Sequence, residues 1–190
     1  DKFQSADSSS IVTGNDYVGG IAGNICTEGG DPSVSGLTAS GAVTGNDYVG
    51  GIIGSLYGVT LSGSYATGDV TANSLAGGLI GSNEGSVEYS YATGNVNANS
   101  LAGGLVGKNE YSSWVSGGNT YYNYASIADS YATGDVNSPD KTGGFVGENT
   151  VDSTIQNSYS IGSVTGTTNT GGFTGLDGGT ITNSYYDKTI

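Results

Sequence analysis

The sequence of 190 residues contains no His, no Met and no Arg, and it has a single Cys and two Pro. Because His is absent, the usual Ser–His and Cys–His nucleophilic pairs and His-based acid–base catalysis are excluded. Cys26 has no second Cys to pair with, so an internal disulfide is excluded as well. Packing and hydrogen bonding must therefore hold the chain together, and the commonest catalytic groups are missing.

Long apolar runs and positive charge are also scarce. The chain has neither an apolar run of about 18 residues nor a secretory signal pattern, so we expect no membrane insertion. Four Lys stand against 17 acidic residues, which gives a net charge of −13 and repels nucleic acid and anionic lipid. We therefore expect neither as a partner, and the length fits a single domain over residues 1–190.

Glycine is abundant, and the spacing of its 36 residues reveals an internal repeat. Six Gly-Gly pairs share one sequence context: Gly19-Gly20, Gly50-Gly51, Gly77-Gly78, Gly103-Gly104, Gly143-Gly144 and Gly171-Gly172. A Val lies seven residues before each pair: Val12, Val43, Val70, Val96, Val136 and Val164. An apolar residue follows each pair: Ile21, Ile52, Leu79, Leu105, Phe145 and Phe173. A third apolar column is formed by Leu61, Val87, Ile127, Ile155 and Ile181. Each unit is thus predicted to have three short core-facing segments.

These units are too short and too rich in glycine for helical repeats. Short runs of Val, Ile, Thr and Tyr, separated by Gly and Asn, are typical of strands and turns. A unit of about 26 residues predicts an all-β fold, a parallel β-solenoid (β-helix) of about six coils spaced about 4.8 Å apart. The crossover preference of parallel strands favours right-handed winding.

A second phrase, "SYATGDV", occurs at 64–70 and 130–136, and "SYATGNV" occurs at 90–96. Strand alternation places Ser64, Ala66, Gly68 and Val70 inside and Tyr65, Thr67 and Asp69 outside. The opposite parity would bury Asp69 without a basic partner, so we expect the tyrosines to face outward. The outward candidates for a ligand-binding face are then Tyr65, Thr67, Asp69, Tyr91, Thr93, Asn95, Tyr131, Thr133 and Asp135. The same residues would alternatively serve only to stabilise strand ladders and keep the surface soluble.

Two irregular loops interrupt the repeat, at 24–35 and 108–126. The second carries the aromatic residues Tyr111, Trp114, Tyr121, Tyr122 and Tyr124. Aromatic side chains mixed with Asn, Ser and Glu are typical of surfaces that stack on sugar rings or contact a partner protein. Alternatively, the loop folds its aromatic side chains onto the coil as a satellite core.

Acidic residues suggest two further functions. Glu28 and Asp31 are candidate ligands for a structural Ca²⁺, although no EF-hand or nonapeptide calcium motif is present, and we expect no other cofactor. A glycosidase needs two or three convergent carboxylates, but Asn95 takes the place between Asp69 and Asp135 in neighbouring units. We therefore expect that the protein is not an enzyme.

The segments "GGLIG" (77–81), "GGLVG" (103–107) and "GGFVG" (143–147), each preceded by "SYATG", resemble the GLUG motif. The resemblance extends over about residues 6 to 187, and the first unit departs most, with Asp7-Ser8-Ser9-Ser10 in place of Tyr-Ala-Thr-Gly. It implies an extracellular module of a secreted or cell-surface microbial protein, such as an adhesin, and brings no catalytic residues.

Several functions remain open at this point. The first is a ligand-binding or spacer module that contacts a glycan or a host or neighbour-cell protein. The second is a structural subunit that associates end to end into a filament, sheath or surface layer, because solenoid ends expose unpaired strand edges. An ice-binding or polysaccharide-active β-helix is a further alternative, although Asp69 and Asp135 interrupt the Thr columns.

Overall fold

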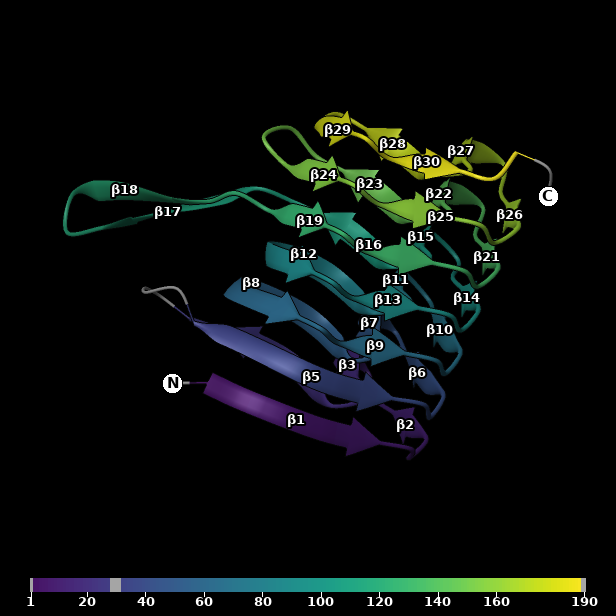
Figure 1. Cartoon of the computed structure of the whole chain (residues 1–190), viewed down its shortest axis with the longest axis horizontal. Helices are drawn as coiled ribbons and strands as arrows, with labels where there is room; N and C mark the ends of the chain where they lie inside the picture. The colour runs from purple at the N-terminus through teal and green to yellow at the C-terminus, as the bar shows by residue number, and fades with distance from the viewer. Residues whose placement is uncertain (1, 28–31, 189–190) are drawn as a thin grey trace.

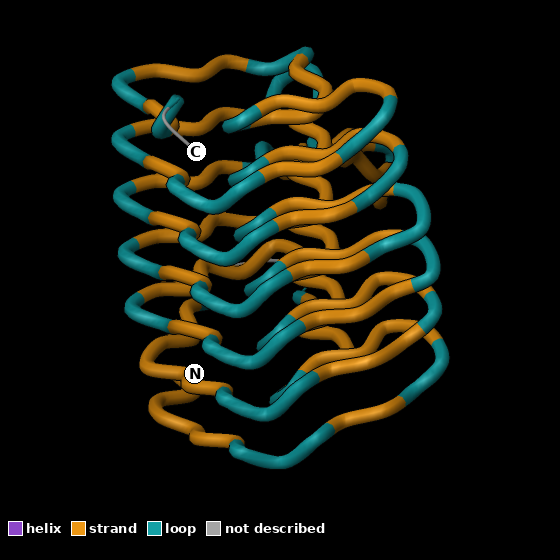
Figure 2. Tube along the Cα trace, turned by 90° about the vertical axis from the view of Figure 1, so that its right-hand side faces the viewer, coloured by secondary structure: helices purple, strands orange, loops and turns teal. Residues whose placement is uncertain are grey.

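The computed structural model of the protein describes residues 2–27 and 32–188. In these residues all regular structure is β, with 30 strands and no helix. The strands wind into a stack of coils, with the two chain ends at opposite ends of the stack (Figures 1 and 2). Two of its sheets have six strands each, and every ladder that joins one coil to the next is parallel. The predicted all-β parallel solenoid of about six coils is therefore confirmed.

Two six-stranded sheets form two sides of the stack. One carries the predicted Val column, in the order β2 (Val12–Thr13), β6 (Val43–Gly45), β10 (Val70–Ala72), β14 (Val96–Asn97), β21 (Val136–Asn137) and β26 (Val164–Thr165). The other ends at the glycine pairs, in the order β27 (Thr168–Gly171), β22 (Asp140–Gly143), β15 (Leu101–Gly103), β11 (Leu75–Gly77), β7 (Asp47–Gly50) and β3 (Asp16–Gly19).

The remaining side is a 16-stranded sheet that holds two ladders joined through long strands. Its main path runs β28 (Thr174–Asp177), β23 (Val146–Asn149), β16 (Val106–Asn109), β12 (Ile80–Glu88), β8 (Ile53–Ser62), β5 (Ser33–Ala39), β9 (Tyr65–Ala66), β13 (Tyr91–Ala92), β20 (Tyr131–Ala132), β25 (Tyr159–Ser160) and β30 (Tyr185–Tyr186). Off this path lie β1 (Lys2–Ser8), β4 (Ala22–Cys26), β19 (Ser126–Ala128), β24 (Thr154–Gln156) and β29 (Thr180–Thr182).

The core of each coil has more inward positions than the three predicted. Ile52, Leu79 and Leu105 are fully buried, as expected, but their direct neighbours Ile53, Ile80 and Val106 are buried too. Two consecutive side chains both face inward here because the chain turns a corner between the sheets, which interrupts strict alternation. A further inward column contains small residues such as Ala76 and Ala102, which a search for large apolar residues misses.

The repeated phrase has the predicted orientation. Ser64, Ala66, Gly68 and Val70 are buried, whereas Thr67 and Asp69 are exposed and Tyr65 is half-buried. The tyrosines of successive coils pair directly, Tyr65 with Tyr91 and Tyr91 with Tyr131. The outward parity of the tyrosines is therefore confirmed.

Buried serines connect each coil to the next. The Ser90 hydroxyl donates to the Glu88 carbonyl oxygen at 2.7 Å and accepts the backbone N–H of Ser64 at 3.1 Å. The same arrangement recurs at the buried Ser64, Ser130 and Ser158 and at the half-buried Ser184. A buried hydroxyl that both donates and accepts a hydrogen bond replaces the bonds it would make to water. Ser is therefore tolerated in a column that is otherwise expected to be apolar.

A second set of buried polar side chains forms an asparagine ladder, which the sequence did not reveal. Nδ2 of Asn83 donates to Oδ1 of Asn109 at 2.8 Å, and Nδ2 of Asn109 donates to Oδ1 of Asn149 at 2.9 Å. Nδ2 of Asn149 then donates to a carboxylate oxygen of Asp177 at 2.8 Å, where the ladder ends. All three asparagines are at most 1% exposed, so water cannot replace the hydrogen bonds that each amide makes to the neighbouring coil.

Candidate ligand-binding site at the base of the aromatic hairpin

The insertion predicted at 108–126 is a β-hairpin that projects from the stack of coils (Figure 1). Its strands β17 (Ser112–Ser116) and β18 (Asn119–Asn123) pair antiparallel, and Gly117-Gly118 forms the two-residue turn between them. Both turn glycines have positive φ, 59° and 80°, which a type I′ hairpin turn requires. Residues 108, 109 and 126, predicted within the loop, belong instead to β16 and β19, so only 110–125 leave the coil.

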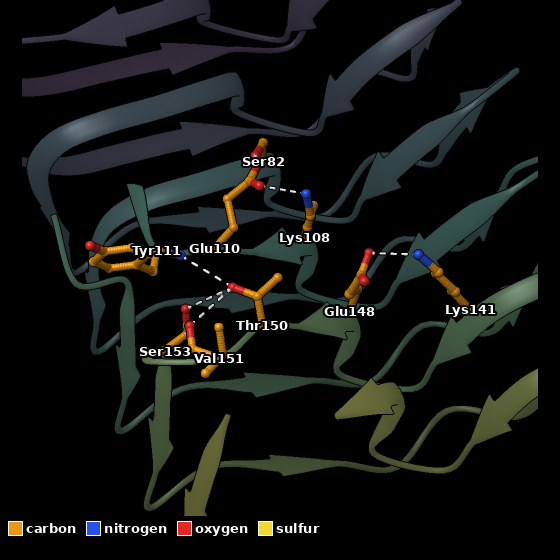
Figure 3. A network of polar contacts seen from close by, with 9 residues as sticks. All are labelled: Ser82, Lys108, Glu110, Tyr111, Lys141, Glu148, Thr150, Val151 and Ser153. Atoms are coloured by element: carbon orange, nitrogen blue, oxygen red, sulfur yellow. Dashed lines mark hydrogen bonds and ion pairs between the residues drawn. The ribbon is translucent and has the colours of Figure 1, made fainter. Parts of the chain in front are cut away.

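The first residues of the hairpin are held by a polar network on the coil (Figure 3). Glu110 accepts a hydrogen bond from the Ser82 hydroxyl at 2.9 Å and forms an ion pair with Lys108. The Tyr111 backbone N–H donates to Oγ1 of Thr150 at 3.2 Å. Burial lowers the pKa of Lys108, but the hydrogen bond and charge of Glu110 outweigh it and raise this pKa above its ordinary value. Lys108 is thus a positively charged anchor and unsuited to act as a general base.

The aromatic side chains divide into two groups. The Trp114 ring lies against Tyr121, with centroids 5.3 Å apart, and against Tyr57 of β8, with centroids 5.9 Å apart. Tyr111, Tyr122 and Tyr124 form the second group, with centroid distances of 5.5 to 6.1 Å. Trp114 therefore docks the hairpin on the coil, as the satellite-core alternative expects. Tyr121, Tyr122 and Tyr124 are 45%, 52% and 60% exposed and remain accessible to a ligand.

A pocket of about 220 Å³ lies where the hairpin meets the coil. Its walls include Gly58, Glu84 and Ser86 from the coil and Tyr122, Asn123 and Tyr124 from the hairpin. Pockets for drug-sized ligands have about 300–1,000 Å³, so this one suits a smaller group, of the size of one sugar ring.

The pocket is acidic, and one of its polar groups has no partner. Glu84 is half-buried, and this burial raises the pKa of its carboxyl above the ordinary value, although the neighbouring Ser112 hydroxyl opposes the shift. Nδ2 of Asn123 is buried and makes no hydrogen bond to the described residues. A buried amide without a partner is unfavourable, so a ligand oxygen that reached it would bind well.

The predicted ladder face is present, but its rings are turned toward one another. Tyr65, Tyr91 and Tyr131 stack with centroids 4.8 and 4.7 Å apart and planes within 4°, and Tyr159 and Tyr185 continue the stack. The faces of the inner rings are therefore covered by their neighbours, which leaves mainly ring edges and hydroxyls to solvent. This stacking indicates that the tyrosines stabilise the ladder between successive coils, as the second interpretation of this face expects.

The acidic column of the same face also connects coils. The backbone N–H of Asn95 donates to Oδ1 of Asp69 at 2.8 Å, and that of Asp135 donates to Oδ1 of Asn95 at 3.0 Å. Asp and Asn are interchangeable at this position because only an acceptor is required. Thr67 and Thr93 are exposed beside this column and Thr133 is half-buried.

The remaining expectations concern metals and membranes. The candidate calcium ligands Glu28 and Asp31 lie outside the described residues. Within 2–27 and 32–188, no group of three or more Cys, Asp or Glu side chains is arranged to hold a metal ion. The same ranges contain no helix that is long and apolar enough to span a membrane.

Within the insertion, Asn123 was not singled out from the sequence, and two coil residues of this site, Tyr57 and Glu84, were not predicted either. Both lie in ordinary repeat units and resemble spacer residues there. They belong to the site because the hairpin docks on β8 and β12, and the sequence offered no indication of where the insertion would dock.

The stack of repeated β-coils places the chain in the class of β-solenoid repeat proteins, whose body is built by stacking one unit. Residues 72–97, about one coil of the stack, match the family model described as the GLUG motif. The match confirms the resemblance and is consistent with a GLUG-motif repeat family. No curated protein and no solved structure matches the chain.

Proposed function

We propose that the chain is a non-catalytic extracellular module of a surface or secreted microbial protein, and that its hairpin binds a glycan in adhesion. The observation that carries this proposal is the pocket at the hairpin base, where exposed Tyr122 and Tyr124 meet Glu84 and Asn123. Sugar rings present apolar C–H faces and hydroxyl groups together. Aromatic rings beside carboxylate and amide groups complement both features.

The solenoid supports this function by its rigidity. Serine, asparagine and tyrosine ladders link successive coils, so the stack forms a stiff platform for the hairpin. Trp114 and the network around Glu110 fix the hairpin base on this platform. A site held in one conformation loses less entropy when it binds a ligand.

A shortened hairpin tests the proposal. Replacing residues 113–122 by Gly-Gly keeps the Ser112–Asn123 pair and closes it with a two-residue turn. On a glycan array we expect this variant to lose the binding of the wild type. Tyr122→Ala alone should weaken it by at least ~10-fold, as for an aromatic hot spot of more than ~1.4 kcal/mol.

Tyr89→Ala is the matched control, because Tyr89 is 64% exposed but lies in a turn outside the hairpin. It should bind glycans as the wild type does. Glycan binding that survives in the shortened hairpin would remove the hairpin from the function, and an array without any hit would refute glycan binding.

A structural subunit that associates end to end is the second candidate. In the first coil, β2, β3 and β4 each pair with a strand on one side only. Ile21, Ile25 and Leu37, together with Ala22 and Val34, line an apolar recess of about 310 Å³ there. Strand edges beside apolar surface favour stacking of a further coil.

If the chains stack in this way, sedimentation should show oligomers whose size grows with protein concentration. A monomer at high concentration would count against end-to-end assembly.

A further inference from the structure

The pocket at the hairpin base has a more specific chemistry than glycan binding in general. We propose that it binds an amino sugar, with the ligand's ammonium group on the Glu84 carboxylate and a neighbouring hydroxyl on Nδ2 of Asn123. This inference rests on the proposed function, because it assumes that the hairpin site takes a sugar. Three observations lead to it: the charge of the pocket, the arrangement of its rings and its unpartnered amide.

The charge of the pocket favours a cationic group. Glu84 contributes a half-buried carboxylate, and none of the described residues that line the pocket is basic. Lys108, the cation among the described residues that acts on the Glu84 carboxyl, is already paired with Glu110. A carboxylate that is partly removed from water without a cation is unfavourable, and a ligand ammonium would relieve this. The net charge of −13 also attracts cations and repels acidic sugars.

The rings of Tyr122 and Tyr124 complement the same group. Their centroids are 6.1 Å apart and their planes are inclined by 32°, so neither ring covers the face of the other completely. Both line the pocket that contains Glu84. Aromatic faces attract an ammonium group within about 6 Å, and they also pack on the C–H face of a sugar ring.

The unpartnered amide decides between two sources of ammonium. Nδ2 of Asn123 is a hydrogen-bond donor, so an ammonium group cannot satisfy it. In a lysine-rich peptide the acceptors are backbone carbonyl oxygens, which the four-carbon side chain separates from the ammonium, whereas an amino sugar carries a hydroxyl on the carbon next to its amine. The volume of about 220 Å³ also suits one sugar ring. The combination therefore favours an amino sugar over a lysine-rich peptide.

Calorimetric titration of the full chain tests the inference with three β-1,4-linked oligosaccharides of equal length, built of glucosamine, N-acetylglucosamine or glucose. At a pH where the amine is protonated, we expect the glucosamine oligomer to bind at least ~10-fold more tightly than the other two. A lysine-rich peptide of the same charge should bind more weakly than the glucosamine oligomer.

Glu84→Gln should reduce the preference for glucosamine to about 2-fold or less, since it removes the charge and keeps the shape. Glu88→Gln is the matched control, because Glu88 is half-buried on the same strand but does not line the pocket. It should keep the preference, and thermal melting should confirm that both variants are folded.

Three outcomes would overturn the inference. These are equal affinity for the three oligosaccharides, an unchanged preference in Glu84→Gln, or the same loss in Glu88→Gln, which would indicate a general charge effect. If glycans without an amine bind and this binding depends on the hairpin, only the inference fails and the proposed function stands. If no glycan binds the wild type, both fail.

Discussion

Gly103→Ala is expected to destabilise the solenoid by more than ~4 kcal/mol, which is among the largest effects of single substitutions. A Cβ on Gly103 would overlap the carbonyl oxygen of Val106 and would lie 2.6 Å from the backbone N of Gly147 in the next coil. Both obstacles are backbone atoms, so no change of side-chain rotamer relieves the contact. The coil would have to open or to separate from its neighbour.

The same contacts explain why the glycine pairs recur. The first glycine of each pair, as at Gly77 and Gly103, approaches the carbonyl oxygen three residues later in its own coil. The second, as at Gly78 and Gly104, approaches a glycine carbonyl oxygen in the next coil, except in the last pair, where Gly172 approaches the ring of Tyr186. None of these residues has positive φ, so lack of space, and not backbone conformation, requires glycine here.

Gly63→Ala provides the matched control for Gly103→Ala. Gly63 has a φ of 56° and no atom within 4 Å of an added Cβ, so only backbone strain opposes Ala there. This strain costs roughly 1–2 kcal/mol. Urea unfolding followed by circular dichroism measures both variants. Similar losses in the two variants would show that space at the glycine pairs is not the cause.

Most of the fold could be predicted from the sequence, because the same contacts recur between successive coils. The Val column and the Tyr65, Tyr91 and Tyr131 column lie in the register that their spacing predicts. A shift of one residue would turn every side chain to the other face, so one register satisfies all coils together. The Asp69–Asn95 exchange looks like variation on a surface in the sequence, but both side chains accept the same kind of hydrogen bond from the backbone of the next coil.

The candidate site was only partly predictable, since it depends on contacts that are made once. The aromatic residues of the hairpin were identified by their composition. Their division into an anchor and an exposed group depends on the contact between Trp114 and Tyr57, which no repeat specifies. The same docking brings Glu84 beside Tyr122, although 38 residues separate them in the chain.

The buried asparagines escaped prediction because Asn in a glycine-rich repeat usually indicates a turn. Asn83, Asn109 and Asn149 nevertheless follow Leu79, Leu105 and Phe145 by four residues each, a fixed spacing that turn residues do not need. The last position is Asp177, which fits because the end of the ladder needs an acceptor only.

Asn109→Ala is accordingly expected to lower the free energy of unfolding by ~2–4 kcal/mol. It leaves the buried Oδ1 of Asn149 without its donor at 2.9 Å, at about 1–3 kcal/mol, and it removes one hydrogen bond of 2.8 Å from Nδ2 of Asn83, at about 0.5–1.5 kcal/mol. Nδ2 of Asn83 keeps the carbonyl oxygen of Gly85 at 3.2 Å. Asn137→Ala is the control, because Asn137 is exposed and its contact to Asn97 is 3.4 Å long. It should cost at most ~0.5 kcal/mol. Equal losses of stability in urea unfolding would mean that the buried ladder stabilises the fold no more than a surface amide does. The stiffness proposed for the platform of the hairpin would then have to come from the close backbone contacts that the glycines allow between coils.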